Sequence, residues 1–425
     1  MGACCTKDHI HGGGYMTYDR DERDSNAGDV GEEVRRGDDG ETVRLRGSSA
    51  FTSMFTQRGR KGVNQDSMTI WEDFSGEKDL VFCGVFDGHG PSGHRVARYA
   101  RDVLPTKLSK AIKKHPSKPE DGLVSIWEAA FEESFKEFDQ ELGYDSSIDC
   151  FCSGATAVTI IKQGEHLVVA NLGDSRAVLC TRGDKHQHIP IQLTVDHKPN
   201  IPCEAERIHN SHGRITAEKE DPDIHRVWVP DADYPGLAMS RSLGDFCLKD
   251  YGVISNPQIS YRNLTRKDEF IVLATDGVWD VLTNKQVINI VASAKNRSTA
   301  AKLVVKLAVR EWKRRFPGSM IDDCAVICVF FKNPPMLMKS MTSVGRRNVR
   351  SHPEFAVSRS CKSMGNDRTR EEAGGSVNRD SSEEELKGGG QGICRSNSLT
   401  RAPPFSRALS HNLKMGKSCH EVEAC

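Results

Sequence analysis

Residues Leu80–Gly90, LVFCGVFDGHG, join an apolar run to two ionisable side chains. The run Leu80–Phe86 is rich in β-branched and aromatic residues, which predicts a buried strand. Asp87 can ligate a hard cation, Gly88 lets a backbone carbonyl approach that cation, and His89 titrates near neutral pH. Asp-Gly after a strand is by itself more typical of a hairpin turn. A metal site therefore requires further carboxylates in similar settings.

Further aspartates lie at the ends of predicted strands elsewhere in the chain. They are Asp66 before SMTIWE, Asp174 in the turn NLGDSR, Asp276 and Asp280 in TDGVWD, and Asp322 and Asp323 before CAVICVFF. Any one of them alone would be interpreted as a solvated turn residue. Together with Asp87 and His89 they predict an oxygen-rich site for Mg²⁺ or Mn²⁺.

Eight motifs follow one another along the chain: KGVNQD, FDGHG, SGATAV, NLGDSR, DHKP, AMSRSLGD, ATDGVWD and DDCAVICVF. In this order they resemble the metal-dependent protein serine/threonine phosphatases of type 2C, and in detail a plant branch of that family. The resemblance covers roughly Phe51 to Lys332 and implies a catalytic domain over residues 51–332. It also implies a four-layer α+β fold, in which two packed antiparallel β-sheets are flanked by helices on both faces.

The pattern of predicted elements agrees with an α+β fold. Short strands joined by tight turns, with helices in blocks instead of strict alternation, favour a mostly antiparallel sheet. The helices are expected at Gly93–His115, Leu123–Leu142, Asn284–Ser293 and Thr299–Phe316. The strands after the first are expected at Cys152–Ile161, His166–Ala170, Arg176–Thr181 and Cys324–Phe331.

The resemblance implies a site with two Mg²⁺ or Mn²⁺ ions. Asp87 would bridge the two ions, and the carbonyl of Gly88 would bind one of them. Asp276 and Asp322 would hold the other ion.

The resemblance also implies the reaction, hydrolysis of phosphoserine and phosphothreonine in protein substrates (EC 3.1.3.16). A hydroxide bridging the metals would attack phosphorus in line, without a phospho-enzyme intermediate. His89 would protonate the departing alkoxide. A third, weaker metal position would use Asp174 and Asp280.

The chain departs from the family pattern at the front of the domain. The family's phosphate-binding arginine and the glutamate four residues after it are matched here by Lys61 and Gln65. Lysine keeps the charge without the bidentate fork of arginine, and glutamine can hydrogen-bond a metal-bound water without adding charge. Asp66 matches the family's aspartate. Asp323 replaces an asparagine beside Asp322, and its added carboxylate could offset the loss at Gln65.

Composition excludes several other classes of protein. The chain of 425 residues has 59 basic and 59 acidic side chains, so it lacks the basic excess of a nucleic-acid-binding protein. No apolar stretch approaches the roughly 20 residues of a membrane-spanning helix. The 14 cysteines form no C-x-x-C pair, and many lie in apolar strands, as in a reducing compartment. We expect a monomer.

The first residues, MGACCT, fit a lipidation pattern. Gly2 followed by Thr6 matches N-myristoylation, and Cys4 and Cys5 are candidates for palmitoylation. Two acyl chains would hold the protein at the cytoplasmic face of the plasma membrane, whereas an unacylated protein would enter the cytosol and nucleus. Residues 1–50 are expected to form a flexible tether and residues 333–425 a disordered tail, because both are poor in large apolar residues.

Two other functions compete with an active phosphatase. A catalytically weak pseudophosphatase that binds phosphoproteins would explain Lys61 and Gln65, but not the intact set of aspartates. A membrane scaffold would use the acylated start and the long tail, with the central domain as a spacer. Phosphatase activity that depends on a divalent metal separates the first function from both alternatives.

Overall fold

The structure is a computed structural model that describes residues 31–114, 122–219, 221–318 and 320–331. The described residues from Glu32 onward belong to one compact unit. The predictions for Gly2, Cys4 and Cys5, and for the tail 333–425, lie outside the described residues.

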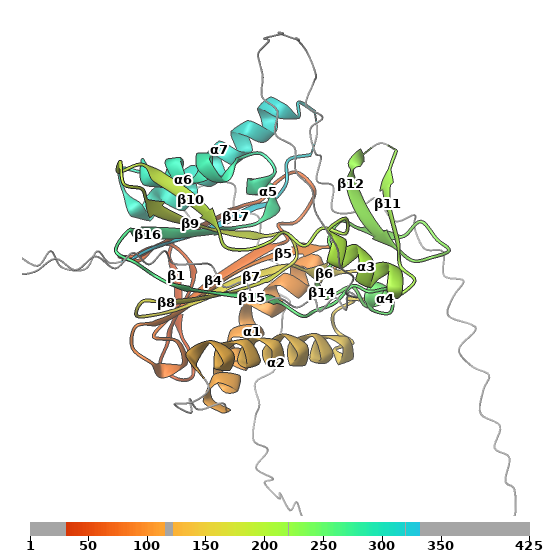
Figure 1. The fold of residues 1–425 in the computed structure, drawn as a ribbon, viewed down its shortest axis with the longest axis horizontal. Coiled ribbons are helices and arrows are strands. Elements are labelled where there is room, and N and C mark those ends of the chain that lie inside the picture. Colours follow the sequence, from red (N-terminus) through yellow and green to blue (C-terminus); the bar gives the residue numbers. More distant parts are fainter. Residues whose placement is uncertain (1–30, 115–121, 220, 319, 332–425) are drawn as a thin grey trace, which may run out of the picture. The chain divides into compact units, whose positions relative to one another are not determined.

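A large antiparallel sheet forms one half of the unit (Figure 1). Its strands, in spatial order, are β1 (Glu33–Arg36), β2 (Thr42–Arg46), β4 (Asp66–Glu72), β5 (Leu80–His89), β7 (Ala157–Gln163), β8 (His166–Leu172) and β15 (Gln258–Asn263). A short strand, β6 (Gly154–Ala155), pairs with the end of β5, and β14 (Leu243–Gly244) pairs with β6.

The second sheet packs against the first. Its order is β10 (His188–Gln192), β9 (Arg176–Arg182), β16 (Asp268–Ala274), β17 (Cys324–Phe330) and β3 (Thr52–Gln57). A separate sheet of three strands contains β11 (Arg214–Glu218), β12 (Asp221–Trp228) and β13 (Pro235–Leu237).

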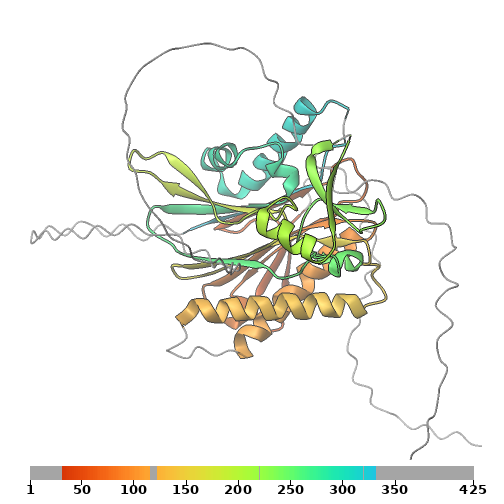
Figure 2. The same ribbon diagram turned by 45° about the vertical axis from the view of Figure 1, so that its right-hand side comes forward.

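Helices cover the outer faces of both large sheets (Figure 2). The first sheet is covered by α1 (Gly93–Lys114) and α2 (Gly122–Tyr144), and the second by α6 (Asn284–Ala292) and α7 (Ala300–Arg315). Shorter elements are α3 (Pro202–Asn210), α4 (Phe246–Lys249), α5 (Asp276–Trp279) and the 3₁₀ turns Phe74–Gly76 and Arg297–Thr299. None of the helices in the described residues is long and apolar enough to cross a bilayer.

Strand β5 shows why the central run is apolar at every position. Successive side chains of a strand point to opposite faces. Phe82 and Phe86 pack under α1 and α2, whereas Cys83 and Val85 face the second sheet. Each buried phenylalanine or valine contributes about 1.5–3 kcal/mol relative to an exposed one. The predicted four-layer fold is confirmed: two antiparallel sheets lie between two layers of helices.

The domain begins before Phe51, so the tether is shorter than the expected residues 1–50. Strands β1 and β2 form a hairpin whose second strand pairs with β4. Val43 and Leu45 are buried in the core beside Trp71, and the buried guanidinium of Arg44 pairs with Glu32. The short strands EVRR and TVRLR carry few apolar residues. This low apolar content makes the two strands resemble a linker in sequence. They are nevertheless stable, because the second strand pairs with β4.

Removing this hairpin should destabilise the domain. We expect a chain that starts at residue 51 to lose about 3–6 kcal/mol of unfolding free energy, because two buried aliphatic side chains and a strand pairing disappear. Urea denaturation followed by tryptophan fluorescence measures the loss, and a chain that starts at residue 32 is the matched control. Equal midpoints for the two chains would show that the hairpin is dispensable.

Candidate active site

The first sheet brings Asp66 and Asp87 together. The start of β4 lies opposite the end of β5, so that these two aspartates are direct partners in the antiparallel register. Strand β5 does not end at Phe86 as expected but continues through His89. Its last two residues pair with β6, Gly88 opposite Ala155 and His89 opposite Gly154. The Asp-Gly step is therefore part of the sheet and not a hairpin turn.

The second sheet places three further aspartates at one edge. Asp276 follows β16, Asp322 precedes β17, and Asp174 precedes β9. Ala274 at the end of β16 pairs with both Val326 and Arg176, so the chain ends that carry these aspartates are neighbours. Asp280 directly follows the short helix that begins at Asp276, and its N–H donates to the Asp276 carbonyl at 2.9 Å.

Hydrogen bonds join the two edges into one site. The Thr275 hydroxyl donates to Oδ2 of Asp66 at 2.9 Å. The carboxylate of Asp323 accepts the backbone N–H of Gly59 at 2.7 Å and that of Gln65 at 2.8 Å. Asp323 therefore holds the loop that precedes β4, and both of its oxygens are engaged by backbone donors.

Two lysines supply positive charge to the cluster. Nζ of Lys61 lies 2.5 Å from Oδ2 of Asp322, and Nζ of Lys198 lies 2.5 Å from Oδ2 of Asp174. Burial opposes the charged form of both lysines, but the neighbouring aspartates outweigh it and raise both pKa values above the usual range. Sequence reasoning missed Lys198, although it lies in the motif DHKP.

The remaining carboxylates are crowded and buried. Burial, followed by the charges of Asp322 and Asp174, raises the pKa of Asp276 to about 7. Burial and neighbouring carboxylates also raise the pKa values of Asp66, Asp87 and Asp280 well above their usual range. Buried carboxylates of like charge favour a bound cation, because it removes both their desolvation and their repulsion.

Unsatisfied oxygens show where a cation fits. Oδ1 of Asp66, Oδ1 of Asp174 and Oδ2 of Asp280 are buried and accept no hydrogen bond from the described residues. Such groups are costly unless something pairs with them. The donor set consists of carboxylate oxygens together with backbone carbonyls, which suits Mg²⁺ or Mn²⁺. The residues present thus fit the metals that the sequence predicts.

Gly88 and Gln65 form the floor of the site beside Asp87. A Cβ on Gly88 would lie 2.3 Å from the Gly93 carbonyl oxygen and 2.8 Å from that of Gln65, so no side chain fits there. The Gln65 side chain donates from Nε2 to the Gly90 carbonyl at 2.8 Å. This amide therefore fixes the loop after β5.

His89 forms a buried pair with an aspartate that the sequence analysis did not single out. Nε2 of His89 lies 2.6 Å from Oδ2 of Asp245, and both side chains are almost fully buried. The hydroxyl of Ser242 donates to the same oxygen at 2.6 Å. Burial opposes a charged imidazole, but the adjacent Asp245 carboxylate raises the pKa of His89 above its usual value. Asp245 ends the motif AMSRSLGD, which is the signal that could have revealed it.

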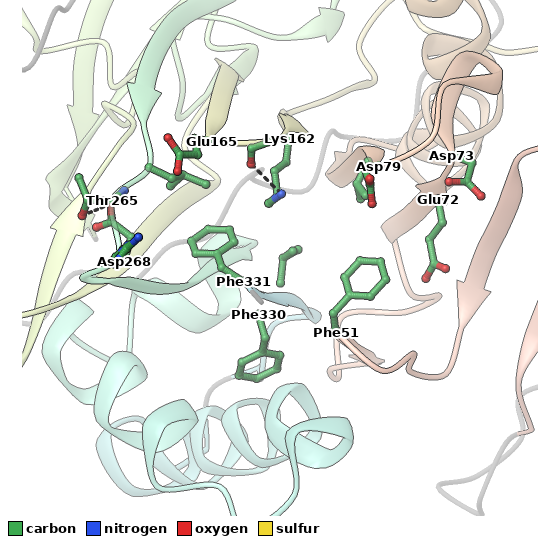
Figure 3. A pocket seen from close by; sticks show the side chains of 15 residues that line it. Phe51, Glu72, Asp73, Asp79, Lys162, Glu165, Thr265, Asp268, Phe330 and Phe331 are labelled. Atoms are coloured by element: carbon green, nitrogen blue, oxygen red, sulfur yellow. Dashed lines mark hydrogen bonds between the residues drawn. The ribbon is translucent and has the colours of Figure 1, made fainter. Parts of the chain in front are cut away.

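A hollow of about 490 Å³ lies at the ends of β5 and β17 that are distant from the aspartate cluster (Figure 3). Val81 at the start of β5 and Val329 near the end of β17 line it, whereas Asp87 and Asp322 lie at the opposite ends of these strands. Six residues of strand, from Val81 to Asp87, span about 20 Å. This hollow is therefore separate from the aspartate cluster.

Three other ligand atoms lie closer together than those of the aspartate cluster. Among the residues that the structure describes, Cys180, His188 and Glu269 are the group whose ligand atoms all lie within 4.8 Å of one another. Burial raises the pKa of Cys180 to about 12, which keeps the thiol protonated, and Arg182 already pairs with Glu269. This group is poorly suited to a metal. The site aspartates are more widely spaced, as like charges favour.

Comparison with known proteins agrees with this geometry. The chain is 53% identical to Probable protein phosphatase 2C 73 of Oryza sativa subsp. japonica over 315 residues, which is 69% of this chain and 75% of that protein. It is 46% identical to Probable protein phosphatase 2C 65 of Arabidopsis thaliana over 370 residues, 83% of this chain and 96% of that protein.

A solved structure shares the fold. The crystal structure of serine-threonine phosphatase 2C from Toxoplasma gondii superimposes with a TM-score of 0.61 at 23% identity, covering 69% of this chain and 99% of that one. The family model described as Protein phosphatase 2C matches residues 49–313. With aspartates from both sheets gathered at one edge and these relatives in agreement, the chain belongs to the protein phosphatase 2C family.

Proposed function

We propose that this protein serine/threonine phosphatase hydrolyses phosphoproteins with two Mg²⁺ or Mn²⁺ ions held by its strand-end aspartates. The observation that carries the proposal is the group of buried carboxylates with raised pKa values and unpartnered oxygens at one edge of both sheets. The similarity to protein phosphatases 2C supports the substrate class. All residues of the proposed site come from one chain, so we propose that the protein acts as a monomer.

Each aspartate has a place in this proposal. Bound cations would neutralise the phosphate and lower the pKa of water, so that a nucleophile forms near neutral pH. Asp87 would contribute to holding both cations, the carbonyl of Gly88 would help to hold one of them, and Asp276 with Asp322 would hold the other. A third, weaker position uses Asp174 and Asp280, where each carboxylate has an unpartnered oxygen.

Lys61 and its neighbours prepare the site for phosphate. The ammonium of Lys61 holds Asp322 in place and brings positive charge to the edge of the aspartate cluster. An ammonium attracts phosphate as a point charge and lacks the planar fork of arginine. We propose that Lys61 binds the substrate phosphate through this charge. Three residues around Lys61 support the site without binding phosphate, because their hydrogen bonds fix the strand ends: Gln65, Asp66 and Asp323.

His89 and Asp245 provide the proton. A serine or threonine alkoxide is a poor leaving group, so its departure requires protonation. The raised pKa of His89 keeps the imidazole protonated at a higher pH than that of a free histidine. Asp245 is a positioning residue, because it fixes the imidazole ring through Nε2. The other ring nitrogen, Nδ1, is buried and has no hydrogen-bond partner among the described residues, so we propose that it faces the leaving group.

Metal dependence tests the proposal directly. Exhaustive chelation should abolish hydrolysis of a phosphothreonine peptide, and Mn²⁺ or Mg²⁺ should restore it. Asp87→Asn should lose activity by about 10²-fold or more, because the substitution removes a negative charge that would help to hold both ions. Asp184→Asn, which alters an exposed aspartate outside the site, is the matched control. Release of phosphate is the measurement, and full activity after chelation would contradict the two-metal site.

The His89–Asp245 pair makes a second prediction that depends on the leaving group. His89→Ala should slow a phosphopeptide by about 10²-fold and p-nitrophenyl phosphate far less, because nitrophenolate leaves without a proton. With Asp245→Asn, the pKa of His89 falls. The loss of phosphopeptide activity at alkaline pH should then begin at a lower pH than in the wild type. Equal losses on both substrates, or an unchanged pH profile, would remove the pair from this role.

We also propose that residues 1–6, MGACCT, anchor the phosphatase to the plasma membrane. The support is the sequence pattern alone: Gly2 for a myristoyl chain and Cys4 or Cys5 for a palmitoyl chain. A single myristoyl chain binds membranes with an association constant of only about 10⁴ M⁻¹, so stable anchoring requires the second chain.

Replacing Gly2 should release the protein from membranes. Gly2→Ala removes the glycine that the myristoylation pattern requires. We therefore expect the variant in the soluble fraction after ultracentrifugation of lysed cells, with unchanged activity on a soluble phosphopeptide. Cys4→Ser combined with Cys5→Ser should leave one weak anchor and an intermediate distribution. Wild type and Gly2→Ala with the same distribution would contradict the lipid anchor.

A further inference from the structure

Two cysteines meet beside the His89–Asp245 pair. The sulfurs of Cys152 and Cys247 lie 3.2 Å apart, although the residues are 95 positions apart in sequence. Backbone hydrogen bonds hold their segments side by side. The Cys247 N–H donates to the Phe151 carbonyl at 2.9 Å, and the Asp245 N–H donates to the Ser153 carbonyl at 2.9 Å. The fold therefore fixes the contact between the two sulfurs.

The cysteine pair is connected to His89 through the backbone on both sides. Cys152 is two residues from Gly154, which pairs with His89 in the sheet. Cys247 is two residues from Asp245, which holds the His89 ring. Packing between the two segments is tight, since a Cβ on Gly154 would lie 2.2 Å from Oδ2 of Asp245. Any shift of one segment toward the other therefore changes the position of the Asp245 carboxylate.

The Cys152–Cys247 pair is more accessible to small oxidants than the core cysteines Cys83 and Cys328, because Cys152 is only partly buried. Cys152 is partly exposed, and Cys247 lines a hollow of about 370 Å³ together with Phe151. The hydrogen bond between the sulfurs lowers the pKa of Cys152, which favours the nucleophilic thiolate. Burial raises the pKa values of Cys83 and Cys328 far above the usual range, so these thiols stay inert.

We propose that Cys152 and Cys247 form a reversible disulfide in the presence of hydroperoxides, and that this disulfide lowers phosphatase activity. The Cys152 thiolate attacks the O–O bond and becomes a sulfenic acid as hydroxide or alkoxide leaves. The Cys247 sulfur then attacks the sulfenic sulfur, forming the S–S bond and releasing water. The two thiols lose two electrons in total, and the hydroperoxide gains them.

The disulfide acts on activity through the position of Asp245. The sulfurs must approach from 3.2 Å to a covalent distance of about 2.05 Å, which draws the two segments together. Asp245 and Gly154 lie within these segments and are already in close contact. A displacement of about 1 Å near a reacting group can cost on the order of 10²-fold in rate. The effect on activity rests on the proposed role of His89, whereas disulfide formation does not.

The experiment treats the full chain with hydrogen peroxide and maps its disulfides by mass spectrometry after alkylation of free thiols. We expect a Cys152–Cys247 peptide, and a fall of about 10-fold in phosphopeptide hydrolysis that dithiothreitol reverses. Hydrolysis of p-nitrophenyl phosphate should fall less. Cys152→Ser should keep its reduced-state activity and resist peroxide. Cys150→Ser, which removes a buried thiol two residues from Cys152, should behave like the wild type.

Each result decides one part of the proposal. Absence of the Cys152–Cys247 peptide, or peroxide sensitivity in Cys152→Ser equal to that of the wild type, would overturn it. A disulfide that forms without any change in activity would overturn the coupling to Asp245. A protein that is inactive even when reduced would contradict the phosphatase proposal instead, and the mass measurement would still report the disulfide.

Discussion

Repulsion among buried carboxylates is the constraint on which this structure depends. Two unit charges 4 Å apart interact by about 4 kcal/mol near a protein surface, and the strand ends of both sheets bring several aspartates into one place. Lys61 and Lys198 offset part of this charge through Asp322 and Asp174. The fold can hold such a cluster because each aspartate lies at the end of a paired strand, whose hydrogen bonds and buried side chains stabilise it independently.

The residues of the cluster were predictable because each lies beside a strong local signal. An apolar run precedes the Asp-Gly step at both Asp87 and Asp276. The resemblance of eight motifs to the type 2C phosphatases implies that these aspartates belong to one metal site. The layered fold followed from the same resemblance. The local pattern alone predicts that strand β5 ends at Phe86. It does not reveal the pairing of Gly88 and His89 with β6, because β6 is a distant part of the chain.

Contacts between distant residues explain what the sequence did not reveal. Asp245, Lys198 and the Cys152–Cys247 pair become significant only when the fold brings them to His89, Asp174 and each other. The sequence of the hairpin at Glu33–Arg46 predicts a linker for the same reason, because its polar strands are stable only through pairing with β4. Periodicity reports which face of an element is buried but not which residue lies opposite.

The unusual residues at the front of the domain illustrate how a site tolerates change. The loop that carries Lys61 and Gln65 is held by Asp323, whose oxygens accept the backbone N–H groups of Gly59 and Gln65. Backbone donors are present whatever the side chain, so this anchor does not depend on which residue occupies position 65. Replacing a glutamate with glutamine and an arginine with lysine therefore alters the charge and reach of the loop while its position stays fixed. Asp323 restores a carboxylate to the site, but one that supports the backbone and leaves the central aspartates to bind the cations.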